Sequence, residues 1–428
     1  MKIIKSNELP KSFFTCEEDE SLAAVSEIIR EVKTRGDAAA REYTRQFDGV
    51  EIDAFAVSDS AVTAAFAQMD TKTVAALQAA AENIRKFAEA QRARLQDFET
   101  ELNPGVFTGQ RVTPLARVGV YVPGGNFPLI STLLMGVLPA KVAGVPEICV
   151  CSPPSHNSGI HPAILAAAKI AGVSEIYQIG GVQAIAALAF GTESIRPVDK
   201  IVGPGNKYVA QAKREVFGAV SIDMIAGPTE IMIIADDSGD PEILAADLLA
   251  QAEHDADARP VLVTTSQALA KAVKKSVARQ LSALSTKATA AAAIRNNGLI
   301  ILTKNLTEAA EIANRKAPEH LEIQVKNAEK YARKLRNFGS LFIGEISAEV
   351  LGDYSSGINH TLPTNTTARY RGGLSVHDFL KIQTTLRVSK KGLESIGPIA
   401  ETLANAEGLE GHAKSIAVRW GMIEERQK

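Results

Sequence analysis

Four of the seven histidines in this 428-residue chain have an acid or an amide close by in the sequence. The four pairs are Gln251 with His254, Glu319 with His320, Asp353 with His360, and Glu407 with His412. Imidazole, carboxylate and an occasional amide are ligands typical of zinc or a similar divalent ion. Each pair alone is more typical of a surface ion pair, and none matches a short zinc signature such as H-E-x-x-H. The pairs therefore leave a metal site and an ordinary surface as open alternatives.

Glycine-rich turns are the second chemical clue. Pro123-Gly124-Gly125, Gly180-Gly181 and Gly203-Pro204-Gly205 each follow an expected strand and precede an expected helix. Such turns let a backbone approach a phosphate at a helix N-terminus. The chain has no G-x-G-x-x-G fingerprint, so tight turns in an α/β fold explain these segments as well as cofactor binding does.

The segments that would position these residues alternate between short β-branched runs and alanine-rich runs from about residue 115 onward. Strands are expected at 118–122, 147–151, 175–179, 200–202, 231–235, 261–264, 299–302 and 340–343. The helices expected between the first of these strands span 131–143, 160–171, 184–190 and 206–217. This alternation predicts parallel sheets with helices on their faces and ligands at the carboxyl ends of the strands.

The flanking segments have a different texture. Acidic residues at 17–21 start an expected helix, and a longer helical region is expected from about 59 to 97. The segment from about residue 355 is rich in loops and then helical, with too little apolar material for its own core. We expect this C-terminal tail to pack on another surface, such as a second subunit.

The bulk composition excludes several classes of protein. Hydrophobic residues make up 46% and charged residues 22%, a globular mix for about two to four domains. The net charge is −2, so there is no basic excess for nucleic acid or an anionic membrane. No apolar run approaches the roughly 20 residues of a membrane span. The three cysteines, Cys16, Cys149 and Cys151, give no disulfide framework, so we expect a cytoplasmic protein.

Eight ordered segments carry a resemblance over nearly the whole chain. They read VGVYVPGG at 118–125, GGVQAIAA at 180–187, VGPGN at 202–206, IDMIAGPTE at 222–230, QAEH at 251–254, APEHLE at 317–322, GDYSSG at 352–357 and EGLEGH at 407–412. In these segments the chain resembles the histidinol dehydrogenase family. The resemblance implies an intertwined homodimer of two incomplete Rossmann-like α/β domains with parallel sheets, plus a small helical and loop C-terminal tail domain.

The resemblance also implies boundaries and residue roles. The expected parts are an N-terminal arm at 1–20, a discontinuous first α/β domain at 21–115 and 230–370, a second, NAD-contacting α/β domain at 116–229, and a tail at 371–428 that packs on the partner subunit. The implied ligands of one zinc ion per subunit are Gln251, His254, Asp353 and His412. The implied acid–base pair is Glu319 and His320. The implied substrate contacts are Thr229, Gln251, His254, His320, Asp353, His360, Glu407 and His412. The implied NAD contacts are Tyr121, Gln183 and Asn206.

The reaction implied by the resemblance is the NAD-dependent oxidation of L-histidinol to L-histidine through L-histidinaldehyde, the last steps of histidine biosynthesis. An alcohol gives up hydride readily only as its proton is lost, and His320, with an ordinary pKa of about 6.5, suits that base. Glu319 can take a proton from the water that adds to the aldehyde, and Glu407 would pair with the substrate ammonium. The expected partners are this small molecule and a second copy of the chain.

Two departures from the family pattern keep alternatives open. Thr229 stands where the family usually has serine, and Asp255-Ala256-Asp257 follows His254 where glycine is common. One alternative is a paralogous zinc and NAD dehydrogenase of another polar primary alcohol, such as a sulfonated diol. The other is a non-catalytic zinc-binding or nucleotide-binding homologue. The sequence leaves open which metal is used, and whether His412 acts in its own subunit or across the dimer.

Overall fold

The computed structural model describes residues 1–15, 23–124, 128–155 and 159–425. The acidic helix start expected at 17–21, Cys16 and Gly125 lie outside the described residues. The chain divides into two compact units, which we call unit 1 (Met1–Ala90 and Leu115–Phe379) and unit 2 (Gln91–Pro114 and Leu380–Lys428). Within the described ranges, no helix is both long enough and apolar enough to cross a membrane.

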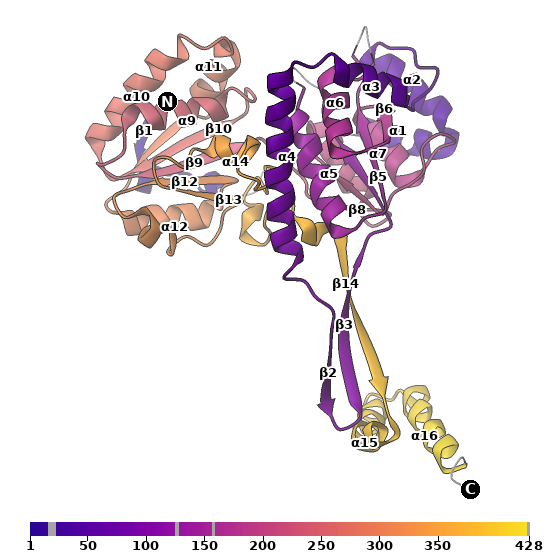
Figure 1. The fold of residues 1–428 in the computed structure, drawn as a ribbon. Coiled ribbons are helices and arrows are strands. Elements are labelled where there is room, and N and C mark those ends of the chain that lie inside the picture. The colour runs from indigo at the N-terminus through magenta and orange to yellow at the C-terminus, as the bar shows by residue number, and fades with distance from the viewer. Residues whose placement is uncertain (16–22, 125–127, 156–158, 426–428) are drawn as a thin grey trace. The chain divides into compact units, whose positions relative to one another are not determined.

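A six-stranded, fully parallel sheet is the centre of one lobe of unit 1 (Figure 1). Its strands in spatial order are β1 (Lys2–Lys5), β11 (Leu299–Leu302), β10 (Arg259–Thr264), β9 (Glu230–Ala235), β12 (His320–Gln324) and β13 (Ser340–Ile343). The helices on one face are α9 (Pro241–Ala252), α10 (Gln267–Leu281) and α11 (Lys287–Asn296), and those on the other are α12 (Leu306–Lys316) and α13 (Ala328–Ala332). Side chains alternate between the faces along each strand, so both faces bury an aliphatic core.

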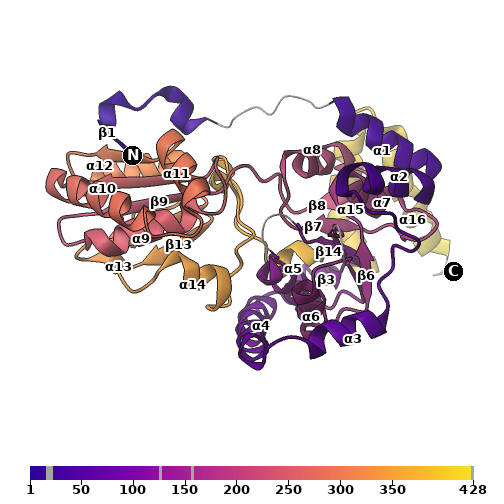
Figure 2. The same cartoon turned by 90° about the horizontal axis from the view of Figure 1, so that it is seen from above.

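A five-stranded parallel sheet is the centre of the second lobe of unit 1, which we call the five-stranded lobe. Its strands in spatial order are β6 (Glu175–Gln178), β5 (Glu147–Ser152), β4 (Arg117–Tyr121), β7 (Lys200–Val202) and β8 (Ser221–Ile222). The helices that surround it are α1 (Ala23–Arg35), α2 (Asp37–Asp48), α3 (Asp59–Ala67), α5 (Ile130–Ala143), α6 (Pro162–Ala171), α7 (Gly181–Phe190) and α8 (Lys207–Val216). Figure 2 shows α7 and α8, with α1 and α2, on one side of this sheet, and α5 and α6 on the other.

The remaining elements of unit 1 are short or connect the two lobes. They are α4 (Thr71–Arg92, whose last residues belong to unit 2), α14 (Glu349–Tyr354) and the 3-10 helices η1 (Ser6–Glu8), η2 (Lys11–Phe14), η3 (Thr367–Arg369) and η4 (Val376–Phe379). The stretch from α14 to Thr361 contributes Asp353, Tyr354, His360 and Thr361 to the lining of one cavity.

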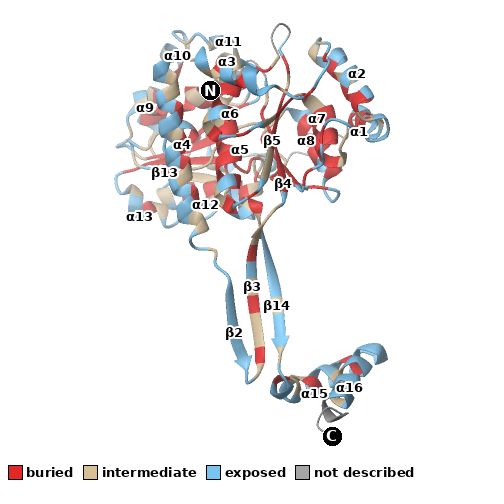
Figure 3. Cartoon of the chain, turned by 45° about the vertical axis from the view of Figure 1, so that its right-hand side comes forward, coloured by how far each residue is buried: buried red, intermediate tan, exposed pale blue. Residues whose placement is uncertain are grey.

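Unit 2 is an antiparallel sheet with two helices. Its elements are β2 (Phe98–Asn103), β3 (Val106–Pro114), β14 (Leu380–Val388), α15 (Lys390–Ala406) and α16 (Glu410–Glu425). Figure 3 shows that β2 and β14 are exposed, while residues of the central strand β3 are buried at intervals. Only loop and helix were expected from about residue 355 onward, which α15 and α16 fit and β14 does not, and no element was expected at 98–114. β14 pairs with β3, where the Thr113 hydroxyl donates to the side chain of Gln383, 270 positions later, and such long-range pairing is beyond the reach of any local pattern.

The predicted α/β class with parallel sheets is confirmed, and all eight expected strands are present. The expected grouping of 21–115 with 230–370 does not match the packing of α1 and α2. These helices pack on α7 and α8, because Val25, Ile28 and Val32 share a core with the five-stranded sheet. The segment expected as an arm at 1–20 contains β1, which pairs with β11. The other boundaries stay predictions.

Candidate active site

A cavity of about 190 Å³ in unit 1 gathers most of the predicted site residues. The predicted residues that line it are Thr229, Gln251, His254, Glu319, His320, Asp353 and His360. They come from the amino ends of β9 and β12, the end of α9, α14 and the loop after it. Gly203, Pro204 and Gly205, which follow β7 of the five-stranded sheet, form part of the opposite wall. A more open hollow of about 640 Å³ at the other end of β12 is lined by none of these residues.

The acid–histidine pair lies at the amino end of β12, although a parallel sheet was expected to place ligands at carboxyl ends. In the six-stranded sheet the residues predicted for the site lie at the amino ends of β9 and β12 instead. The chain leaves α12 through Ala317, whose φ of 51° turns it directly into the strand. The amide of Ser340 bonds the Glu319 carbonyl at 2.9 Å, so the ladder with β13 already holds the pair. β12 was not among the expected strands, although polar His320, Glu322 and Gln324 alternate with apolar residues at the two-residue period that is typical of a strand.

Glu319 is a buried carboxylate held by a short chain of donors. Its Oε2 accepts hydrogen bonds from the Thr229 hydroxyl at 2.7 Å and from the Glu230 amide at 2.9 Å. Gln251 donates its side-chain amide to the Thr229 hydroxyl. Burial raises the pKa of Glu319 to about 7, against the opposing effects of His320 and the Thr229 hydrogen bond. The carboxyl group can therefore both take up and release a proton near neutral pH.

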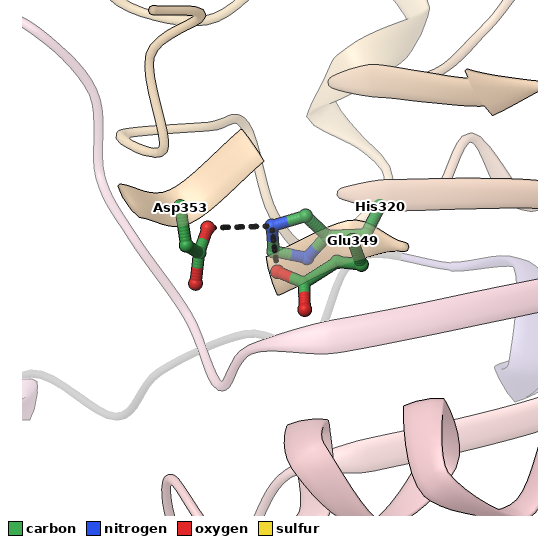
Figure 4. Close-up of side chains that lie close together, drawn as sticks. All are labelled: His320, Glu349 and Asp353. Carbon is green, nitrogen blue, oxygen red and sulfur yellow. Dashed lines mark ion pairs between the residues drawn. The ribbon is translucent and has the colours of Figure 1, made fainter. Parts of the chain in front are cut away.

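The hydrogen bonds of His320 define its proton-bearing nitrogen. Nδ1 lies 3.2 Å from the Glu230 carbonyl, which can only accept, so Nδ1 carries the hydrogen. Nε2 faces Oε1 of Glu349 at 3.3 Å and Oδ1 of Asp353 at 3.8 Å (Figure 4). Burial lowers the pKa of His320, but the charges of Glu319, Glu349 and Asp353 raise it by more than burial lowers it. The pKa of His320 is therefore raised from its ordinary value to about 8. Nε2 is the atom that can exchange a proton with a ligand.

Glu349 was missed by the sequence analysis. It stands four residues before Asp353 on α14, a spacing that puts two side chains on one helix face and could have been recognised. Among the described residues, His320, Glu349 and Asp353 each offer one donor atom within 4.8 Å of the others, close enough to share a metal ion. Gln251 lines the same cavity and offers an amide oxygen as a further possible metal ligand, because its Oε1 is buried without a hydrogen-bond partner.

His360 lies on the loop after α14, and each of its ring nitrogens has a hydrogen-bond partner. Its Nδ1 lies 3.1 Å from the Asp353 carbonyl, so that nitrogen donates. Its Nε2 lies 3.1 Å from the hydroxyl of Thr132 on α5 and accepts from it. Burial lowers the pKa of His360, which favours this neutral form. The ring thus joins α14, which carries Asp353, to α5, a helix of the five-stranded lobe.

The three residues predicted to contact NAD lie near the ends of strands in the five-stranded sheet. Tyr121 ends β4, and its hydroxyl accepts from the amide of Gly181, where α7 begins. Gln183 is fully buried on α7, and its Oε1 has no hydrogen-bond partner. Asn206 caps α8 by accepting from the amides of Tyr208 and Val209. The described walls of the 190 Å³ cavity include none of the three side chains, although they include the adjacent Gly203–Gly205 turn.

Glu407 and His412 belong to unit 2. Glu407 ends α15, His412 lies in the first turn of α16, and both side chains are exposed. The structure thus brings seven of the predicted residues into one cavity within unit 1 and leaves these two on a separate unit.

The family model for histidinol dehydrogenase matches residues 15–420. The chain belongs to the histidinol dehydrogenase family. Histidinol dehydrogenase from Lactiplantibacillus plantarum is 50% identical over 398 residues, which are 93% of this chain and 92% of that protein. The enzyme from Rhizobium meliloti is 49% identical over 405 residues, 94% and 93% of the two chains.

A crystal structure of histidinol dehydrogenase from Elizabethkingia anophelis matches with a TM-score of 0.93 and 38% identity, and covers 99% of each chain. The resemblance stated from the sequence is therefore confirmed, as is the α/β fold that it implied. As a member of the histidinol dehydrogenase family, the chain is an oxidoreductase.

A buried acidic cluster continues the polar face of β12 away from the cavity. Glu322 and Gln324 follow His320 at intervals of two residues, so all three side chains face α9. Gln324 donates to Glu322 and, at 3.1 Å, to Asp247 of α9. Phe342 and Ile233 flank Glu322 on the neighbouring strands. Burial and the nearby Asp247 raise the pKa of Glu322 to about 9, so it is uncharged at neutral pH.

This raised pKa predicts how Glu322 affects stability. An acid with a higher pKa in the folded state than in the unfolded chain destabilises the fold progressively as pH rises from about 4.5 to about 9. We expect Glu322→Gln, which cannot ionise, to melt roughly 2 °C above the native protein at pH 9 and to differ little at pH 5. Thermal melting of both proteins across this range is the measurement. Glu329→Gln, at an exposed position on α13, is the control, and a deficit of Glu322→Gln that is equal at both pH values would contradict the prediction.

Proposed function

We propose that this chain is an NAD-dependent, zinc-containing enzyme that oxidises L-histidinol to L-histidine through L-histidinaldehyde, the last steps of histidine biosynthesis. The observation that carries the proposal is the single cavity in which Glu319 and His320 meet Gln251, His254 and Asp353. The names of the relatives, which match over more than nine tenths of both chains, support the same substrate.

His320 is the base of the first oxidation in this proposal. Its Nε2 takes the proton of the primary hydroxyl, while Nδ1 stays bonded to the Glu230 carbonyl and keeps the ring oriented. NAD, when bound, accepts the hydride in each of the two oxidations. The alcohol thereby becomes the aldehyde, and the proton held at Nε2 is passed on before the next step. Glu349 lies beside Nε2 and stabilises the protonated ring.

Glu319 serves the second oxidation. Water must add to the aldehyde carbonyl before a second hydride can leave, and the Glu319 carboxylate takes one proton from that water. His320 then takes the remaining hydroxyl proton of the hydrate as it is oxidised to the carboxylate. The two bonds from Thr229 and Glu230 fix the Glu319 Oε2, so its other oxygen is the one that can face the water.

We propose that Gln251, His254, Asp353 and His412 hold the zinc ion. The buried, unpartnered Oε1 of Gln251, beside an imidazole and a carboxylate, supports this set, because zinc favours nitrogen and oxygen donors of these kinds. Zinc, when bound, would hold the imidazole and amine of the substrate. His320 is left out of the set because Nε2 must stay free to act as the base. His360 and Glu407 are proposed as further substrate contacts.

Tyr121, Gln183 and Asn206 are proposed to contact NAD. Their support is their place near the carboxyl ends of parallel strands, where open α/β sheets bind nucleotides. The unpartnered Oε1 of Gln183 is a buried acceptor that a cofactor could satisfy.

A homodimer in which the tail of one chain contributes Glu407 and His412 to the partner's site is also a proposal. Unit 2 carries exposed apolar side chains of the kind that interfaces cover. They include Ile382, Leu386, Ile399, Leu403 and Leu409. A cytoplasmic location stays a prediction from the sparse cysteines.

The alternative substrate suggested by Thr229 gains no support from the structure. The hydroxyl of Thr229 makes the bond to Glu319 that a serine would make, and only a methyl group is added. Turnover of histidinol with two NADH formed per molecule tests the proposal against this alternative. Zinc-loaded protein that ignores histidinol and reduces NAD with another polar alcohol would overturn it.

Glu319→Gln is predicted to separate the two oxidations. The amide keeps the acceptor for Thr229 but cannot take a proton, so oxidation of added histidinaldehyde falls by about 10²- to 10⁴-fold while aldehyde formation persists. In the native protein, aldehyde oxidation should rise with pH through about 7, as Glu319 loses its proton. Single-turnover NADH formation at a series of pH values measures both. Glu311→Gln, exposed on α12, is the control, and an unchanged aldehyde rate in Glu319→Gln would refute the assignment.

Gln251→Ala is predicted to weaken zinc binding. Loss of one neutral ligand should lower the metal retained after gel filtration by about 10-fold or more at limiting zinc. Elemental analysis of the purified protein gives this quantity without any assay of activity. Gln267→Ala, at an exposed position on α10, should retain zinc like the native protein. Equal zinc content in both variants would remove Gln251 from the ligand set.

A further inference from the structure

Helix α5 contains a proline whose effect reaches the active site. Pro139 has no amide hydrogen, so the carbonyl of Met135, four residues earlier, lacks its normal helical donor. The side-chain amide of Asn359 donates to this carbonyl at 2.8 Å. Met135 itself is fully buried, and an unpaired acceptor there would be costly. A proline within the helix and an asparagine 220 positions later in the sequence thus form one interaction.

Asn359 is fixed at both ends of its amide group. Its Oδ1 accepts from the backbone amide of Thr361 at 2.9 Å, which holds the side chain against its own loop. The next residue, His360, bonds Thr132, which lies three residues before Met135 on α5. Residues three apart share a face of a helix, so Asn359 and His360 bond the same face of α5, at Met135 and at Thr132.

The other end of this loop is fixed on a second helix. The side-chain amide of Asn83 on α4 donates to the carbonyl of Ser355 at 2.8 Å. Gly357 has a φ of 94°, and a Cβ on it would lie 2.5 Å from the Asn83 carbonyl oxygen. The loop is therefore anchored before and after its centre. Next to His360 it is held by the bond from Asn359 to Met135 and by the Thr361 carbonyl, which accepts from the Leu374 amide at 2.8 Å.

We propose that Asn359 is a positioning residue that recognises the carbonyl freed by Pro139 and thereby holds His360 at the wall of the cavity. The bond links α5, which packs on the five-stranded sheet, to the loop that follows Asp353. Asn359 does not line the cavity and acts through His360. This inference rests on the proposed function, in which His360 contacts the substrate.

The direct test replaces the donor without changing the shape of the side chain. Asn359→Asp keeps the acceptor for Thr361 but offers the Met135 carbonyl no hydrogen. We expect kcat/KM for histidinol to fall about 10-fold, chiefly through a higher KM for histidinol, while the KM for NAD changes less than twofold. Asn337→Asp is the matched control, because Asn337 also donates its side-chain amide to a carbonyl, that of Asn314, at 2.8 Å. An unchanged KM for histidinol in Asn359→Asp would overturn the inference.

A double-mutant cycle separates positioning from a general loss of stability. If Asn359 acts through His360, then Asn359→Asp should add little to the defect of His360→Ala, so the two effects on kcat/KM do not multiply. If Asn359 only stabilises the fold, the effects multiply and the variant shows a lower melting temperature with an unchanged KM. That second outcome contradicts the inference.

Failure of the proposed function can be recognised separately. If the native zinc-loaded protein does not oxidise histidinol, the substrate assignment fails, and amide hydrogen exchange then tests the interaction itself. Asn359→Asp should speed exchange in peptides that cover 355–364, since the loop loses its bond to the Met135 carbonyl. The same exchange rate in the native protein and the variant would overturn the inference without reference to any substrate.

Discussion

The site depends on placing an acid and a histidine side by side where little water reaches them. Glu319 and His320 are each at most 6% exposed, and charges in such surroundings are costly unless other groups stabilise them. The backbone of Glu230 does this for both, donating its amide to one and accepting at its carbonyl from the other. Glu230, at the start of β9, therefore sets the position of both proton-transfer groups, and the parallel pairing of β9 with β12 sets the position of Glu230.

The same burial gives the two groups different proton affinities from those they have in water. Burial alone raises the pKa of Glu319 and lowers that of His320. The acids around His320 more than reverse its change, so both groups exchange protons within about one pH unit of each other. A reaction that removes protons from a hydroxyl, from water and from a hydrate needs groups that gain and lose protons readily at neutral pH. The acidic environment is thus part of the chemistry and not only an ion-pair network.

The two α/β lobes of unit 1 are joined by side chains of the loop that follows α14. Asn359 and His360 contact α5, while Asp353 faces His320 at the opposite end of this short segment. His360 also donates to the Asp353 carbonyl at 3.1 Å, so its ring contacts both α14 and α5. A helix proline that frees a carbonyl, and so weakens α5 locally, gives the Asn359 contact a specific acceptor that neighbouring turns do not offer.

The sequence by itself determined the alternation of strands and helices, the parallel sheets and the residues that resemble the family's site, because these depend on local periodicity and short motifs. The two-residue alternation at 320–324 could have revealed β12, but β14 and the packing of α1 and α2 depend on partners far along the chain. The sequence named Glu319 and His320 as a pair, but an adjacent acid and histidine have ordinary pKa values on a surface. Only the tertiary structure buries them against Glu230, Glu349 and Asp353, and that burial, a property of the whole fold, decides their proton chemistry.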